Sequence, residues 1–118
     1  MFVYFTNTER ERMSAHFNQL SPAQHERLAI LSEELGEAQQ AIGKILRHGY
    51  ESYDPTLIVP EDERPPTNRE NLEKELGDVV FSINLLGDDI YQPAVGRRFI
   101  EKSAKIKPYL HHQAGGAE

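Results

Sequence analysis

Two pairs of acidic residues in this chain have the spacing needed to bind a divalent cation together. Glu34 and Glu37 are three residues apart in one apolar helical pattern, and Glu75 and Asp78 are three apart in another. Residues three apart are neighbours on a helix surface, with roughly 5–6 Å between Cβ atoms, so each pair forms a two-carboxylate clamp. Four carboxylates that face one interior repel one another and lose hydration unless a cation offsets both costs. Because Mg²⁺ and Mn²⁺ suit hard oxygen ligands, the pattern predicts a site for one of these ions.

The apolar residues around each pair indicate where the carboxylates lie. Each pair borders the apolar stripe of its own helix, and both Glu34 and Glu75 are one turn from stripe residues on either side. An isolated acidic pair at helical spacing more often forms a solvated face, because Glu is rarely buried. Two such pairs on successive helices favour the metal site over that alternative. The stripes consist of Leu28, Leu31, Leu35, Ala38, Ile42 and Ile45, and of Leu72, Leu76, Val79, Val80, Ile83 and Leu86.

A long helix is predicted to carry the first acidic pair. Ser21 followed by Pro22 is typical of an N-cap with proline at the first helical position. The apolar periodicity continues to Arg47, with His48 also in the last turn, and Gly49 provides a C-terminal stop.

A second helix is predicted to carry the other pair. Residues 50–66 contain four prolines and form a loop of the length that often has a binding function. Thr67 and Glu70 then make a capping box, which starts a helix that runs to about Leu86. After a turn at Gly87, a third helix is expected to open at Pro93 with a stripe as far as Leu110, and Pro108 leaves the end of this helix open. The expected fold is all-α, with antiparallel helices in a core of the four-helix-bundle type.

Composition limits both the size of the core and the kinds of partner. The chain has 118 residues, of which 38% are hydrophobic, and a mean hydropathy of −0.61, so one domain with a lean core is expected. This shortage predicts that further copies complete the core, as a homodimer or homotetramer. The net charge of −6 argues against binding to nucleic acid or to an anionic membrane. The absence of cysteine excludes disulfides, thiol catalysis and zinc–cysteine sites.

The ends of the chain differ from its middle. Residues 1–12 are expected to form an N-terminal extension, residues 13–112 the helical domain and residues 113–118 a flexible tail. The opening aromatic run is too short for a signal peptide, and no run approaches the length that spans a membrane. A cytoplasmic location is therefore expected.

The acidic motifs and their surroundings resemble a known family. The run Leu31 to Glu37 reads LSEELGE, and the run Leu72 to Val80 reads LEKELGDVV. Together they resemble the MazG-like family, which belongs to the all-α nucleoside triphosphate pyrophosphohydrolases and has E-E-x-x-E on one helix and E-x-x-D on the next. Both motifs are intact here, although the proline-rich segment makes the interval between them long. The similarity extends from about Ser21 to Leu110.

The resemblance implies a reaction and a set of roles. It implies Mg²⁺-dependent cleavage between the α and β phosphates of a nucleotide, which gives a monophosphate and pyrophosphate, by an assembly of at least two subunits. Glu34, Glu37, Glu75 and Asp78 would then bind the metal. Glu33, the fifth carboxylate, is a candidate general base for a water that attacks phosphorus, and the alternative is that Glu33 is simply solvated. Without a cysteine or a recognisable serine triad, direct attack by water is the simplest route.

Further residues are candidates for substrate binding. Lys44 and Arg47 follow Glu37 on the same helix and would hold phosphates, or would be the usual cations at a helix C-terminus. Asn84 is placed to contact sugar or phosphate. Aromatic or imidazole rings at His16 and Phe17 would stack on a base, although a phenylalanine is more often part of the core. The last helix offers one face, either for phosphate or simply exposed, that consists of Arg98, Lys102, Lys105 and Tyr109.

The leading hypothesis is therefore a Mg²⁺-dependent pyrophosphohydrolase that acts on NTP or dNTP substrates. Within the same chemistry, a narrower enzyme for dUTP or dCTP, or for a guanosine alarmone, is the alternative. From another class, the chain would be a catalytically silent helical module that binds a nucleotide or a protein. An intact set of five carboxylates argues against the silent module, because such a module has no need of mutually repelling charges.

Overall fold

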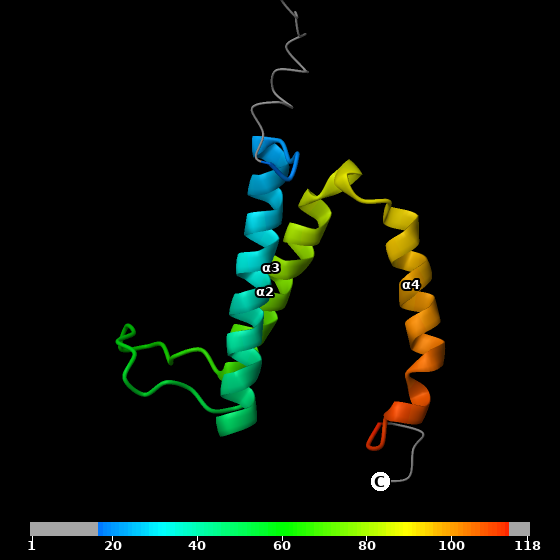
Figure 1. The fold of residues 1–118 in the computed structure, drawn as a ribbon. Coiled ribbons are helices and arrows are strands. Elements are labelled where there is room, and N and C mark those ends of the chain that lie inside the picture. The colour runs from blue at the N-terminus through cyan, green and yellow to red at the C-terminus, as the bar shows by residue number, and fades with distance from the viewer. Residues whose placement is uncertain (1–16, 114–118) are drawn as a thin grey trace, which may run out of the picture. The chain divides into compact units, whose positions relative to one another are not determined.

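The computed structural model describes residues 17–113 (Figure 1). The α-helices of this segment are α2 (Pro22–His48), α3 (Asn68–Leu85) and α4 (Gln92–Lys105), and its short 3₁₀-helices are η1 (Gly87–Asp89) and η2 (Lys107–Tyr109). The same segment contains no strand, and only an isolated β-bridge joins Tyr53 to Thr67. The prediction of an all-α fold is confirmed at this level.

The structure divides into two units, and the boundary between them in the chain falls between Leu86 and Gly87. The first unit holds α2, α3 and the loop between them, and the second holds η1, α4 and η2. Within the described residues, no helix is both long enough and apolar enough to cross a membrane. Residues 1–16 and 114–118, including His16, the predicted N-terminal extension and nearly all of the predicted tail, lie outside the described residues.

Local signals at its two ends explain why α2 forms where it does. The side chain of Ser21 accepts a hydrogen bond from the Gln24 backbone N–H at 3.1 Å, and the Gln24 side chain accepts one from the Ser21 N–H at 2.9 Å. This reciprocal capping satisfies two N–H groups that have no partner within the helix. At the other end, Gly49 adopts a φ of 88°, and its N–H donates to the Ile45 carbonyl at 2.7 Å. The predicted start is confirmed, and the helix ends one residue beyond the predicted Arg47.

The second long helix, α3, begins with the predicted capping box. Thr67 accepts a hydrogen bond from the Glu70 N–H at 3.2 Å, and Glu70 accepts one from the Thr67 N–H at 3.0 Å. Arg64 adds an ion pair with Glu70. Together these bonds lower the pKa of Glu70 to about 2, the Arg64 contact being the largest cause. The loop and the start of α3 are therefore held together by one carboxylate.

The two long helices run antiparallel, side by side, and pack through small residues (Figure 1). The buried apolar side chains among the described residues are those of Ala38, Ala41, Val79 and Leu86. Ser82, which is fully buried, donates from its hydroxyl to the Asp78 carbonyl at 2.8 Å. Short side chains allow close approach of the helices, but four small or medium-sized apolar residues make a very small core for a chain of this length.

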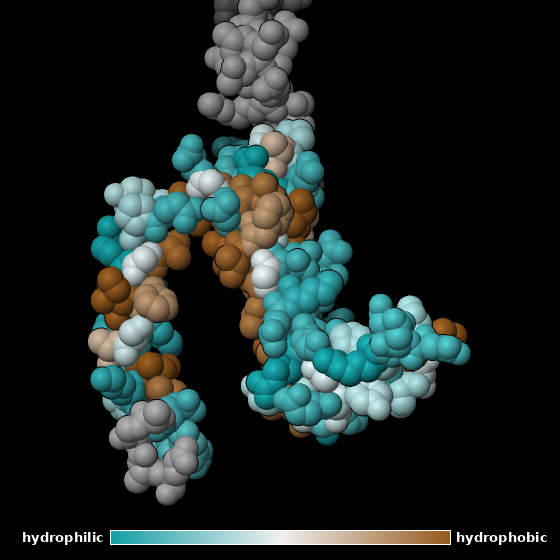
Figure 2. All heavy atoms as spheres, turned by 180° about the vertical axis from the view of Figure 1, so that it is seen from behind, coloured by the Kyte–Doolittle hydropathy of each residue, from teal (hydrophilic) through white to brown (hydrophobic). Residues whose placement is uncertain are grey.

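Many larger apolar side chains remain exposed along the helix pair, and Figure 2 shows hydrophobic residues gathered along it. Residues of α2 that are seven apart lie on one helical face. Leu28, Leu35 and Ile42 have this spacing and are 43%, 51% and 45% exposed. The exposed apolar residues of α3 are Leu76, Val80, Phe81 and Ile83.

The second unit consists of one amphipathic helix with a short extension. No residue of α4 is buried, and the helix ends at Lys105, with the Ile106 N–H bonded to the Lys102 carbonyl at 2.9 Å. The predicted stripe therefore does not continue to Leu110 in α-helical form. Pro108 explains the difference, because proline has no N–H to donate and its ring clashes with the preceding turn, and here it lies in η2.

Candidate metal centre

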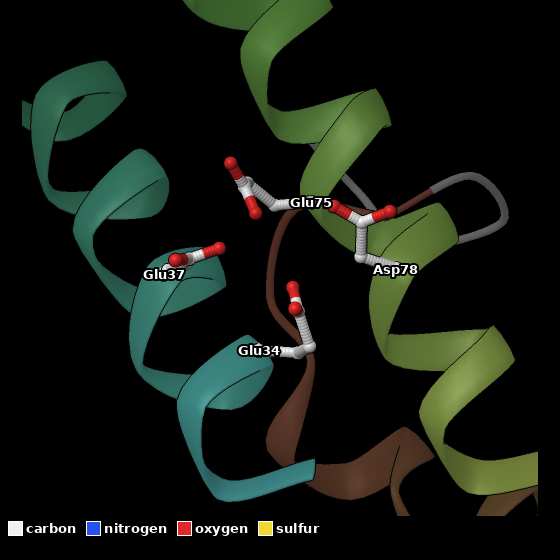
Figure 3. A group of neighbouring side chains, drawn as sticks. All are labelled: Glu34, Glu37, Glu75 and Asp78. Carbon is white, nitrogen blue, oxygen red and sulfur yellow. The ribbon is translucent and has the colours of Figure 1, made fainter. Parts of the chain in front are cut away.

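The four carboxylates that were predicted from their spacing converge between α2 and α3 (Figure 3). Glu34, Glu37, Glu75 and Asp78 each offer one oxygen, and these oxygens lie within 4.8 Å of one another. All four side chains are half-buried. The three-residue spacing places each pair on the inner side of its helix, and the antiparallel packing brings the two pairs together.

Two oxygens in this carboxylate cluster, Glu34 Oε2 and Glu75 Oε2, are buried and have no hydrogen-bond partner among the described residues. A buried carboxylate oxygen without a partner is costly, because it has lost its hydration without replacement. The nearest cation is Lys74, whose Nζ lies 3.4 Å from Glu75 Oε1 and 3.3 Å from Asp78 Oδ2. Lys74 is mostly exposed, so solvent screens much of this attraction.

The proximity of the other carboxylates affects the pKa of Glu37. Its pKa is raised above the ordinary 4.5, chiefly by a hydrogen bond with Glu75 and then by the negative charge of Glu34. Each of these causes makes a further negative charge in the cluster less favourable. The cluster therefore favours an added positive charge, and its all-oxygen donor set with two unpartnered oxygens fits Mg²⁺ or Mn²⁺.

A pocket of about 820 Å³ adjoins the cluster, and Glu37 and Glu75 belong to its wall. Its volume falls within the range of small-molecule sites. Lys44, Arg47 and Lys74 bring positive charge to the lining, so carboxylates and cations share one cavity. The remaining polar lining consists of Gln40, His48, Ser52, Tyr53, Asp54, Asn68 and Asn71.

The pocket includes residues that sequence analysis did not single out. Gln40 follows Glu37 by three positions and Asn71 precedes Glu75 by four, so helical periodicity places both on the same faces as the acidic residues. Ser52, Tyr53 and Asp54 come from the loop, where no periodicity exists to indicate which side chains face a pocket.

Other predicted site residues lie outside this cluster and pocket. Glu33 is exposed on α2 one turn before Glu37, and its charge is among the lesser causes of the raised pKa of Glu37. Asn84 is exposed on α3, and Phe17 is 89% exposed, so Phe17 does not belong to the core of the described unit.

The basic residues of the second unit are placed on α4 and η2. Arg98 and Lys102 line a hollow of about 600 Å³ together with apolar residues such as Val95 and Phe99. Lys105 and Tyr109 are exposed and do not line that hollow. Arg98 also lies 3.4 Å from Glu101, three residues later on the same helix.

The chain matches no protein-family model, no curated protein and no solved structure.

Proposed function

We propose that this protein is a divalent-metal-dependent hydrolase that converts nucleoside triphosphates, or their deoxy forms, to monophosphates and pyrophosphate. The observation that carries the proposal is the convergence of four carboxylate oxygens within 4.8 Å beside a pocket lined by cations. The resemblance of the acidic motifs to those of the MazG-like family supports the type of reaction. The unpartnered oxygens of Glu34 and Glu75 favour this proposal over a silent helical module, which gains nothing from that cost.

The carboxylates of the cluster and the cations of the pocket have different proposed roles, metal binding and substrate binding. Glu34, Glu37, Glu75 and Asp78 would hold Mg²⁺ or Mn²⁺, which would offset the phosphate charge and make a water more acidic. Lys74 neutralises the charge of the phosphate chain beside the cluster, and Lys44 and Arg47 remain proposed substrate contacts in the pocket wall. Phosphoryl-type transfer depends mainly on such positioning and neutralisation, so no covalent intermediate on the protein is needed.

In the proposed reaction a water oxygen bonds to the α-phosphorus, and the bond from that phosphorus to the bridging oxygen breaks. Glu33 is the proposed acceptor of the water proton. It is exposed to solvent and lies one turn from Glu37, so it is close to the cluster without belonging to it. Asn84, Phe17 and His16, and the basic face of α4 and η2, remain proposed substrate contacts.

We also propose that a second copy completes the core, as a homodimer or homotetramer with a four-helix bundle. The support is the combination of a very small buried core with exposed apolar residues along both long helices. Apolar area removed from water contributes roughly 25 cal/mol per Å², so pairing these faces would supply the stabilisation that the small core lacks. In such a bundle each copy contributes α2 and α3.

A panel of nucleotides tests the proposed reaction. The purified full-length chain is incubated with each nucleotide and Mg²⁺, and pyrophosphate and monophosphate are measured. Release of both in equal amounts, lost on chelation of the metal and in Glu37→Gln, supports the proposal. Glu26→Gln is the matched control, because Glu26 is an exposed carboxylate on the same helix outside the cluster. No hydrolysis of any nucleotide, or equal hydrolysis by Glu37→Gln, would overturn it.

A further inference from the structure

The loop between α2 and α3 contributes Leu57 and the four consecutive residues from Ser52 to Pro55 to the pocket, and none of them has a role in the reaction proposed above. Ser52, Tyr53 and Asp54 form part of the wall that faces the C-terminal half of α2. Asp54 is the informative member, because it places a carboxylate in a pocket that is proposed to receive an anionic ligand.

Contacts with the first turn of α3 hold the base of this loop in place. The Asn68 N–H donates to the Ser52 carbonyl at 2.8 Å, and the Arg69 N–H donates to the Tyr50 carbonyl at 2.9 Å. Arg69 also lies 2.7 Å from Glu51, and its guanidinium group is 4.3 Å from the centre of the Tyr50 ring. These bonds use N–H groups at the start of α3 that would otherwise be free to bind phosphate. The wall is thus preorganised, and the start of α3 is not a phosphate site.

Asp54 is held as an anion. Both the backbone N–H and the hydroxyl of Thr56 donate to Asp54 Oδ1, at 2.9 and 2.6 Å. The hydroxyl bond is the largest cause of a lowered pKa of Asp54, and the nearby charge of Lys44 contributes to it. Both bonds go to Oδ1, and within residues 17–113 no hydrogen bond to Oδ2 is found, so Oδ2 can accept one from a ligand. A fixed carboxylate repels phosphate and accepts hydrogen bonds from hydroxyl or amino groups.

We propose that the Tyr53–Asp54 end of the pocket binds the nucleoside part of the substrate, with Asp54 accepting a hydrogen bond from a sugar hydroxyl or a base amino group. The inference rests on the proposed function, since it assigns the two ends of a nucleotide to the two ends of one pocket. The phosphates lie at the carboxylate cluster, where a metal and Lys74 offset their charge.

The layout of the pocket agrees with this orientation. Lys44 is seven residues beyond Glu37, which is about 10 Å along the axis of α2 at 1.5 Å per residue. Ser52, two residues before Asp54, donates from its hydroxyl to the His48 carbonyl at 2.6 Å, and His48 lies beyond Lys44 on α2. The Tyr53–Asp54 wall therefore belongs to the end of the pocket that is farther from the cluster. Tyr53, half-exposed at the pocket wall, offers an aromatic face on which a base stacks, and its backbone is fixed by the bridge to Thr67.

Binding measurements on the full-length chain test the orientation. Calorimetry in Mg²⁺ compares an α,β-imido nucleoside triphosphate, which resists cleavage at the α-phosphorus, with inorganic tripolyphosphate, which has no nucleoside. The variants are Asp54→Asn and Tyr53→Ala. Asp62→Asn is the matched control, because it makes the same charge change in the same loop at a residue that does not line the pocket.

The proposal predicts that Asp54→Asn raises the Kd of the nucleotide about tenfold, the effect of one charge-assisted hydrogen bond. Tyr53→Ala weakens the binding of the nucleotide as well. Tripolyphosphate binding stays unchanged or tightens in Asp54→Asn, and Asp62→Asn matches the wild type with both ligands. A dideoxynucleotide then identifies the donor: the effect of Asp54→Asn disappears if the donor is a sugar hydroxyl and persists if it is a base amino group.

The assignment of the nucleoside to this end would be overturned if the loop variants raised the Kd of both ligands equally, lowered both equally or changed neither. These outcomes differ from failure of the proposed function. If the wild type binds neither ligand in Mg²⁺, the nucleotide pocket itself is wrong. If the wild type binds both and the loop variants do not distinguish them, only the orientation is wrong.

Discussion

Glu37 on α2 and Glu75 on α3 each place a carboxylate oxygen in the cluster, where these oxygens lie within 4.8 Å of one another, and both residues line the pocket. Two carboxylates this close repel each other, which raises the pKa of Glu37, and a proton relieves that repulsion. A divalent cation gives the same relief without a proton, so metal and protons compete for these oxygens. The relationship links the helix packing to the proposed chemistry, because each helix contributes one half of the pair.

Replacement of Glu33 by glutamine tests its role as the proton acceptor. We expect Glu33→Gln to lower kcat by about 10²- to 10⁴-fold, the usual contribution of a general base, while Mg²⁺ and nucleotide binding stay near the wild-type values. The measurement combines steady-state kinetics with calorimetry of both ligands. If Glu33→Gln loses metal binding as well, then Glu33 is a ligand, and if kcat is unchanged, Glu33 is simply solvated.

The bond that is cleaved can be identified separately. Hydrolysis of a nucleoside triphosphate in ¹⁸O-labelled water, followed by mass spectrometry, should place the label in the nucleoside monophosphate or in the pyrophosphate. Attack at the α-phosphorus predicts label in the monophosphate. Label in inorganic phosphate, with a nucleoside diphosphate as the other product, would show attack at the γ-phosphorus instead.

The ion pair and capping bonds of Glu70 predict a dependence of stability on acid pH. The pKa of Glu70 is lowered from 4.5 to about 2, so its stabilising contribution is present above 4.5 and is lost as the pH falls toward 2. Glu70→Gln should therefore have a lower Tm than wild type at pH 6, and its Tm should decrease less than that of wild type as the pH falls from 4.5 toward 2. Thermal melts of Glu70→Gln against Glu73→Gln, an exposed carboxylate on the same helix, provide the comparison. Identical pH profiles for wild type and Glu70→Gln would contradict the prediction.

A charge on the exposed apolar face of α2 should disrupt self-association. Leu35 is 51% exposed in the single chain, so Leu35→Lys should reduce the stability of the α2–α3 pair only slightly. It should destabilise the oligomer strongly, because it places a charge in the proposed apolar interface. Light scattering at micromolar concentration should show an oligomer for the wild type and a monomer for Leu35→Lys. Ala29→Lys is the control, since Ala29 is exposed on another face of α2. A monomeric wild type, or an oligomer that survives Leu35→Lys, would contradict the proposed assembly.

The sequence predicts the helices and the cluster because both depend on local spacing. Ser21, Thr67 and Gly49 mark helix ends through bonds to nearby backbone groups, and those bonds are present. The carboxylates converge because a three-residue spacing on each of two helices leaves little freedom once the helices pack. These are short-range rules, so they can be read from the chain alone.

Other features depend on where the loop folds back, which spacing does not specify. Tyr53 and Asp54 line the pocket because Ser52 and Tyr50 bond to the start of α3, and no periodic pattern indicates that contact. The end of α4 was also left open, because the apolar stripe continues to Leu110 while Pro108 is unfavourable in a helix; in the structure α4 ends at Lys105. One proline therefore had more influence on the end of the helix than a stripe with four apolar residues, Val95, Phe99, Ile106 and Leu110.

The central claim is that the carboxylate cluster binds a divalent cation, and the melting temperature with and without Mg²⁺ or Mn²⁺ tests it most directly. For wild type, an ion at 100 times its Kd should stabilise the fold by about 2.7 kcal/mol and raise the Tm accordingly. Metal-free Glu37→Gln should melt at or above metal-free wild type, because one repelling charge is gone, and should respond far less to the ions; Glu26→Gln should respond as wild type does. A wild-type Tm that neither ion changes, or an equal rise in Glu37→Gln, would contradict the account.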